Sequence, residues 1–162
     1  MNDVLTKEMK ESIDYELSKF PDHQKRSASL SSIRIVQDCG DGSVTNEQLE
    51  AIADYLEIPH VAMFEVATFY SMCKREPIGK YNIGICTNVS CMLNNSHGIV
   101  EHMKKRLDIG FGETTKDGKF TLEEVECLGS CTTAPMCQIN KDYYERLTPE
   151  KVDTILDELS EK

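Results

Sequence analysis

The sequence predicts a two-part α+β chain, in which a small helical bundle is followed by an α/β domain. Up to about residue 79, apolar residues recur at three- and four-residue intervals, as they do on the buried face of a helix. From residue 80 onwards, short alternating segments bounded by turn residues indicate β-strands between helices. We therefore expect domains at residues 1–79 and 80–162, joined through the proline-containing segment 75–79.

Four short helices are expected in the first part. The second should end at Cys39 and Gly40, because glycine readily takes the left-handed conformation that follows many helices. Thr45 and Gln48 have the form of a capping box at the start of the third helix, and Pro59 is expected near the start of the fourth. The apolar residues that we expect in the bundle core are Met9, Ile13, Leu17, Phe20, Leu30, Ile33, Val36, Leu49, Ile52, Ala53, Leu56, Val61, Phe64, Val66, Ala67, Phe69, Tyr70 and Met72.

The second part begins with the alternating segment 81–86, which predicts a strand. Ser96 is expected to cap a helix, and three further strands are expected in residues 120–125, 135–139 and 143–144. The last helix has a strong start signal: a capping threonine, a proline at the first helical position and a glutamate near the positive end of the helix dipole. These residues are Thr148, Pro149 and Glu150. The resulting order, β-α-β-β-β-α, predicts an α/β domain.

The composition excludes several classes of function. A chain of 162 residues is long enough to bury a core without disulfides. Its 28 acidic residues outnumber 18 basic residues, and the net charge of −10 argues against binding to nucleic acid or to an anionic membrane surface. No apolar run approaches the roughly 18 residues of a spanning helix, and residues 1–8 lack the features of a secretory signal. We therefore expect a cytoplasmic protein without direct membrane insertion.

The cysteines carry the strongest chemical signal. In a reducing compartment, clustered cysteines indicate metal binding or catalysis rather than disulfides. Four of the seven form two close pairs, Cys86 with Cys91 and Cys127 with Cys131, and each pair follows a predicted strand. If those two strands are neighbours, the four thiolates converge, and four thiolates hold either an iron–sulfur cluster or a structural zinc ion.

The spacing within the pairs separates these alternatives in part. Neither pair has the C-x2-C knuckle that most structural zinc sites use. The C-x4-C-x2-C pattern of plant-type ferredoxins and the C-x-x-C pattern of thioredoxin-type dithiols are also absent. Two separated pairs suit a two-iron cluster with one pair on each iron. Structural zinc, and simple burial of the cysteines as small apolar residues, stay open as alternatives.

The segments around these cysteines resemble the thioredoxin-like [2Fe–2S] ferredoxin family. Residues 126–136 (ECLGSCTTAPM) carry the second pair, and Cys86 and Cys91 lie upstream of it. Residues 65–70 (EVATFY) and 112–120 (GETTKDGKF) are similar to the helical-domain signature and the connecting loop of its members. The resemblance covers most of the chain, and within the family it is with the small ferredoxin subunits of respiratory NADH:quinone oxidoreductases.

The resemblance implies a thioredoxin-like second domain with one [2Fe–2S] cluster bound by Cys86, Cys91, Cys127 and Cys131. It implies an electron-transfer subunit without catalytic residues of its own. FMN and NAD would be bound by a flavin-bearing partner subunit, in a larger respiratory complex at the inner face of the membrane. The equivalent subunit of an NAD-linked hydrogenase or formate dehydrogenase is the nearest alternative, and a zinc-stabilised adaptor is an alternative of another class.

The other candidate motifs are expected to be structural. Cys39, Cys73 and Cys137 have no partner at ligand spacing, although Cys137 follows the second pair closely enough to approach the cluster. Residues 110–112 (GFG) are similar to the start of a dinucleotide-binding fingerprint, but Thr115 stands where the third glycine belongs. We expect a loop there, so NADH should bind elsewhere.

Overall fold

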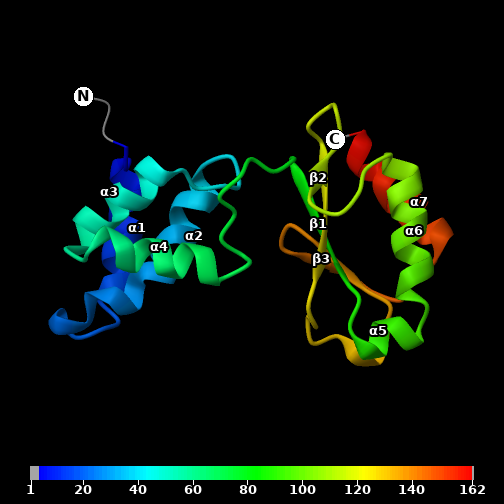
Figure 1. Ribbon diagram of the computed structural model, residues 1–162, viewed down its shortest axis with the longest axis horizontal. Helices are drawn as coiled ribbons and strands as arrows, with labels where there is room; N and C mark the ends of the chain where they lie inside the picture. The colour runs from blue at the N-terminus through cyan, green and yellow to red at the C-terminus, as the bar shows by residue number, and fades with distance from the viewer. Residues whose placement is uncertain (1–3, 162) are drawn as a thin grey trace. The chain divides into compact units, whose positions relative to one another are not determined.

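The structure is a computed structural model that describes residues 4–161. The first three residues of the N-terminal stretch inspected for a secretory signal therefore lie outside the described residues. The chain divides into two compact units, Met1–Pro77 and Ile78–Lys162 (Figure 1). The predicted order, a helical part followed by a part that mixes strands and helices, is confirmed. No helix among the described residues is long and apolar enough to cross a membrane.

Among the described residues of the first unit, from residue 4 onwards, there are four α-helices and one 3₁₀-helix. Their bounds are α1 (Lys7–Leu17), η1 (Asp22–Ala28), α2 (Ser29–Cys39), α3 (Asn46–Leu56) and α4 (His60–Phe69). The capping box that begins α3 is confirmed, because Gln48 donates its N–H to the Thr45 hydroxyl and accepts the Thr45 N–H in return. Pro59 directly precedes α4. One apolar core joins the four helices, with Ile13, Ile33, Leu49, Ile52 and Leu56 fully buried.

Two expectations for the first unit are wrong. Helix α2 ends at Cys39 as predicted, but Gly40 has φ −101°, and the left-handed residue is Gly42 with φ 79°. The Gly40 N–H closes the helix with an ordinary hydrogen bond to Val36, so the turn comes two residues later.

Several apolar residues at α4 are exposed instead of buried. The side chain of Phe69 is 80% exposed, and Val61, Tyr70 and Met72 are exposed as well. Helix α4 ends at Phe69, and Tyr70 is extended, so the residues beyond leave the helical face that contacts the core. Ala62, Met63 and Ala67 form that buried face.

The second unit is built on one five-stranded sheet, with the strand order β2-β3-β1-β4-β5. The two central strands, β1 (Tyr81–Cys86) and β3 (Phe120–Val125), are parallel neighbours. The other strands, β2 (Glu113–Thr114), β4 (Cys137–Ile139) and β5 (Asp142–Tyr144), add antiparallel edges. The short strand β2 lies where the sequence predicts a loop.

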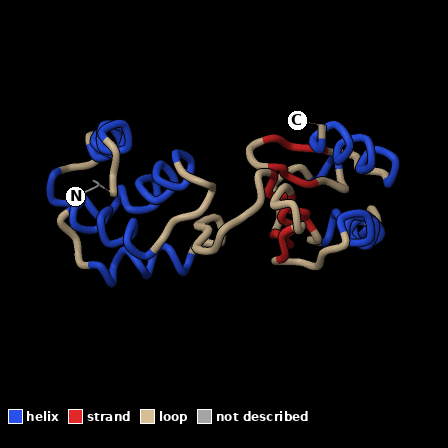
Figure 2. The backbone as a smooth tube through the Cα atoms, turned by 90° about the horizontal axis from the view of Figure 1, so that it is seen from above, coloured by secondary structure: helices blue, strands red, loops and turns tan. Residues whose placement is uncertain are grey.

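Helices α6 (Ser96–Leu107) and α7 (Pro149–Ser160) lie together on one face of this sheet (Figures 1 and 2). Ion pairs join the two helices, as between Arg106 and Asp157 at 2.6 Å. The predicted Thr148 cap of α7 is confirmed, because its hydroxyl accepts the N–H of Lys151. The core between helices and sheet contains Ile83 and Ile85 of β1, together with apolar residues from both helices. This packing leaves the carboxyl ends of β1 and β3 side by side.

Candidate metal centre

The two cysteine pairs follow the two central strands. Cys86 is the last residue of β1, and it pairs in register with Val125, the last residue of β3. Cys127 lies two residues further along. The two strands are therefore neighbours, which is the condition on which convergence of the four thiolates depends. Cys91 is in the short helix α5 (Val89–Leu93), and Cys131 begins the 3₁₀-turn η2 (Cys131–Thr133).

The four sulfur atoms form one group. The Sγ atoms of Cys127 and Cys131 are 3.3 Å apart. The thiols of Cys86 and Cys91 share a hydrogen bond, and Cys131 interacts electrostatically with both of them. The structure thus brings together all four cysteines that the sequence singles out.

Three hydrogen bonds between side chains and the facing loop hold the two cysteine segments together. The Thr87 hydroxyl donates to Glu124 at 2.7 Å, and the Asn88 side-chain N–H donates to Glu126 at 2.5 Å. The Ser90 hydroxyl donates to the backbone carbonyl of Cys131 at 2.9 Å. Asn88 also accepts the Val89 N–H and so caps α5. The three contacts between segments 87–90 and 124–131 hold the first cysteine segment at a fixed distance from the second.

Burial differs between the two pairs. Cys86 and Cys91 are each 2% exposed and pack with Met136, against which Leu128 and Ala134 lie. Cys127 and Cys131 are exposed. The Ala134–Pro135 peptide bond, in the segment that leads to Met136, is cis. One edge of the sulfur group is thus enclosed by apolar side chains, and the other faces outwards.

Backbone N–H groups point at two of the sulfurs. The Gly129 N–H donates to the Cys127 sulfur and lowers the pKa of that thiol. Gly129 has φ 86°, a conformation that side-chain-bearing residues rarely adopt. Burial raises the pKa of Cys91 to about 11, and the hydrogen bond with Cys86 adds to this, whereas the Met136 N–H donates to the Cys91 sulfur and acts in the opposite direction. Cys127, at the exposed edge, therefore has a lower pKa than the buried Cys91.

The donor set fits a [2Fe–2S] cluster. Such a cluster takes four cysteine thiolates, two on each iron. Within residues 4–161, no three cysteine, histidine or acidic side chains are gathered tightly enough to surround a single metal ion. A two-iron group does not need that arrangement, because its protein ligands come in pairs. Two linked pairs, with N–H donors directed at the sulfurs, therefore fit the ligand requirement of a two-iron group.

A carboxylate that sequence reasoning missed reaches the second cysteine loop. Glu145 accepts hydrogen bonds from the hydroxyls of Ser130 and Thr133, the latter at 2.8 Å. These hydrogen bonds lower the pKa of the Glu145 carboxyl, with the Ser130 contact contributing most. Glu145 lies 14 residues beyond Cys131 in the sequence, and only the return of the chain through β4 and β5 brings it here. No spacing pattern in the sequence signals this contact.

The remaining cysteines lie apart from the site. Cys137 packs in the core between the sheet and helices α6 and α7, where burial raises its pKa to about 12. The expectation that Cys137 could approach the cluster is wrong, because its side chain is on the helix-covered face with Ile85. Cys39 is exposed at the end of α2, and Cys73 is buried in the helical core.

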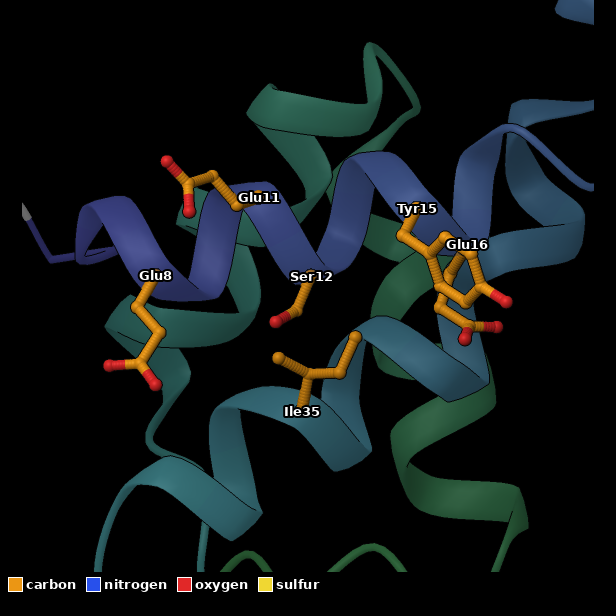
Figure 3. A pocket seen from close by; sticks show the side chains of 6 residues that line it. All are labelled: Glu8, Glu11, Ser12, Tyr15, Glu16 and Ile35. Atoms are coloured by element: carbon orange, nitrogen blue, oxygen red, sulfur yellow. The ribbon is translucent and has the colours of Figure 1, made fainter.

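A shallow hollow on the first unit contains none of these cysteines. It lies between α1 and α2 (Figure 3), and its lining residues are Glu8, Glu11, Ser12, Tyr15, Glu16 and Ile35. Three of the six are acidic, and no basic residue lines it. The hollow therefore offers carboxylate and hydroxyl groups but no thiol ligands, unlike the cysteine site.

Comparison with known proteins agrees with the cysteine chemistry. The model of the thioredoxin-like [2Fe–2S] ferredoxin family matches residues 13–160. The E-type subunit of the NADH-quinone oxidoreductase of Rickettsia felis is 46% identical over 144 residues, covering 89% of this chain and 86% of that protein. A second relative, an E-type subunit of the same class of enzyme in Rhizobium meliloti, is 40% identical over 149 residues, covering 92% and 87%.

Among solved structures, a chain of an air-oxidised NAD⁺-reducing [NiFe]-hydrogenase superposes with a TM-score of 0.71 at 18% identity. It matches 87% of this chain, which spans about a quarter (24%) of that hydrogenase chain. The same enzyme in its H₂-reduced state gives a TM-score of 0.65 at 19% identity, covering 72% and 20%. At this level of identity, the likeness supports the fold alone.

Proposed function

Because the chain belongs to the thioredoxin-like [2Fe–2S] ferredoxin family, we propose that it is the electron-transfer subunit of an NADH:quinone oxidoreductase. Cys86, Cys91, Cys127 and Cys131 hold one [2Fe–2S] cluster, and single electrons pass between it and the flavin of an NADH-binding partner subunit. FMN and NAD are bound by that partner, and the chain turns over no substrate alone. Residues 1–79 form the helical domain, and residues 80–162 form the cluster-binding domain.

The observation that carries this proposal is the grouping of four cysteine sulfurs at the ends of two parallel strands. A [2Fe–2S] cluster supplies reversible one-electron storage when bound. The thiolates bind it, and the apolar enclosure of Cys86 and Cys91 keeps water from one edge. Cys127 and Cys131 are exposed, so the partner's flavin approaches on their side.

The residues around the sulfurs also set how easily an electron is accepted. Hydrogen bonds to the sulfurs stabilise added negative charge and raise the reduction potential. The N–H groups of Gly129 and Met136 are such donors. Glu124 and Glu126, held against the first cysteine loop, place negative charge nearby and act in the opposite direction. All-cysteine clusters of plant-type ferredoxins have potentials of about −400 mV, well below those of histidine-ligated Rieske centres, so all-cysteine ligation favours a low potential here.

The choice of complex rests on the relatives. Proteins at 40–46% identity over most of their length are named as subunits of NADH-quinone oxidoreductase, which favours this assembly over an NAD-linked hydrogenase or formate dehydrogenase. We propose accordingly that the chain acts within a respiratory complex, on the cytoplasmic side and peripheral to the membrane.

The test is iron and acid-labile sulfide analysis, with a visible spectrum, on protein purified anaerobically. Two iron and two sulfide per chain, with absorbance that bleaches on reduction, are expected. A colourless chain that contains zinc would refute the proposal, because Zn²⁺ is d¹⁰ and has no visible transitions. An electron paramagnetic resonance (EPR) signal generated by NADH with the co-purified flavin subunit identifies the partner.

A further inference from the structure

The corner between β5 and α7 is tied to the second cysteine loop by a carboxylate. Glu145, in this corner, accepts both the Ser130 hydroxyl and the Thr133 hydroxyl at the same oxygen, Oε1. The two hydroxyls are themselves 2.6 Å apart. All three side chains are half-buried, so the hydrogen bonds are partly shielded from water.

Two further hydrogen bonds hold the backbone of the corner that carries Glu145. The Arg146 N–H donates to the Thr133 carbonyl at 2.8 Å, and Lys151 of α7 donates to the Glu145 carbonyl at 2.6 Å. The corner can therefore shift only by breaking several hydrogen bonds together. A side chain held in this way positions what it touches.

The loop that Glu145 holds contains an exposed candidate ligand. Cys131 lies between Ser130 and Thr133 in the sequence, and both neighbours donate to the same carboxylate oxygen. The Cys131 sulfur is 3.3 Å from that of Cys127. A change in the turn Cys131–Thr133 would move the Cys131 sulfur and alter this spacing.

We propose that Glu145 is a positioning residue of the cluster site, which fixes the Cys131 turn and keeps the reduction potential low through its negative charge. The inference rests on the proposed function, since it concerns the cluster held by these cysteines. It assigns to one carboxylate, outside the cysteine motifs, both the geometry of an exposed ligand and part of the redox tuning.

A carboxylate is suited to both roles for a physical reason. One ionised oxygen accepts two hydroxyl protons at once, and hydrogen bonds to a charged acceptor are stronger than those between neutral groups. A unit charge on the order of 10 Å from the cluster, at an effective dielectric constant of about 40, changes the ratio of reduced to oxidised cluster by roughly fourfold.

The experiment compares four variants of the full chain, purified anaerobically with their clusters. Glu145→Gln removes the charge and keeps an acceptor oxygen, whereas Glu145→Ala removes both. Thr133→Val removes one donor and keeps the charge. Glu158→Gln is the matched control, because it makes the same change of charge on the exposed face of α7, nine residues beyond the start of that helix. The measurements are iron content, the EPR-detected reduced fraction at a fixed potential and low ionic strength, and the rate of bleaching by a chelator.

With Glu145→Gln, we expect wild-type iron content and a ratio of reduced to oxidised cluster about fourfold higher, which is about 36 mV at 59 mV per tenfold. Glu145→Ala should show the same rise or more and bleach several-fold faster. Thr133→Val should bleach faster with the ratio within twofold of wild type, and Glu158→Gln should change neither. If Glu145 only held the loop in place, Glu145→Gln could change the bleaching rate but would leave the ratio of reduced to oxidised cluster at the wild-type value.

Two results would overturn the inference in distinguishable ways. If the wild-type chain holds a cluster and both Glu145 variants behave like Glu158→Gln, the role of Glu145 is refuted and the proposed function stands. If the wild-type chain holds no iron, the proposed function is refuted, and the role of Glu145 with it. Should Glu145→Ala prove unfolded by circular dichroism, the Gln and Val variants decide the question by the same criteria.

Discussion

Replacing Gly129 by alanine isolates the contribution of one backbone conformation to the cysteine site. Gly129 has φ 86°, and a Cβ built there meets no heavy atom within 4 Å, so alanine fits without a clash. The cost is therefore that of the left-handed backbone alone, about 1–2 kcal/mol. This shifts the loop equilibrium roughly 5- to 30-fold away from the conformation that aims the Gly129 N–H at Cys127.

The chain offers a matched control for this change. Gly118 has φ 70° and also has no heavy atom within 4 Å of an added Cβ, but it lies in the turn before β3. Gly129→Ala and Gly118→Ala should lower the thermal midpoint to a similar extent. Only Gly129→Ala should accelerate bleaching of the cluster by a chelator, by the same roughly 5- to 30-fold. Equal bleaching rates for the two variants, whether fast or slow, would refute the claim that the left-handed conformation of Gly129 contributes to holding the cluster.

Three other perturbations test the ligands, the contact between the cysteine loops and an ion pair of the helical unit. Cys86→Ser and Cys131→Ser should each lose most of the bound iron, whereas Cys39→Ser and Cys73→Ser should retain it. An iron assay measures this, and the reverse pattern would show that the ligand assignment is wrong. Ser90→Ala removes the hydrogen bond to the Cys131 carbonyl and should cost about 1 kcal/mol, which a chemical denaturation series would detect against the exposed control Ser71→Ala. The hydrogen bond that the His60 ring donates to the Asp54 carboxylate raises the pKa of His60. The stabilisation by this pair should therefore be fully present below the unfolded-state pKa of about 6.5 and disappear as pH rises through the higher folded-state pKa. A thermal midpoint whose pH dependence in that range is the same in His60→Gln would contradict this.

The sequence predicts the cysteine site well because local signals suffice there. A strand signal directly before each cysteine pair places Cys86 and Cys127 at strand ends, and only the pairing of the strands remains to be supplied by the fold. The family resemblance supplies the cluster type, since spacing alone leaves zinc open. Two helix starts are equally local, because Thr45 and Thr148 both cap as their neighbours indicate. The expected cap at Ser96 is wrong, because α6 already includes Ser96 and is preceded by Asn95, whose side chain makes no capping hydrogen bond.

What the sequence does not predict depends on contacts between distant segments. Glu145 reaches Ser130 and Thr133 only because β4 and β5 fold back beside the cysteine loop. Helix α5 is too short to show a periodic pattern, although Asn88 before an apolar residue is a capping signal. Phe69 fits a helical core pattern by position, but the helix ends at that residue. Apolarity does not distinguish such a surface side chain from a buried one.

The parallel pairing of β1 with β3 also determines when the site can form during synthesis. The ribosome releases Cys86 and Cys91 well before Cys127 and Cys131, because some 35 residues separate the two pairs. At 5–20 residues per second, translation of that interval takes roughly two to seven seconds. Throughout that time the first two thiols stand without their partners, next to an unpaired β1 edge. A metal group that needs all four thiolates can therefore be bound only after Cys131 has been synthesised.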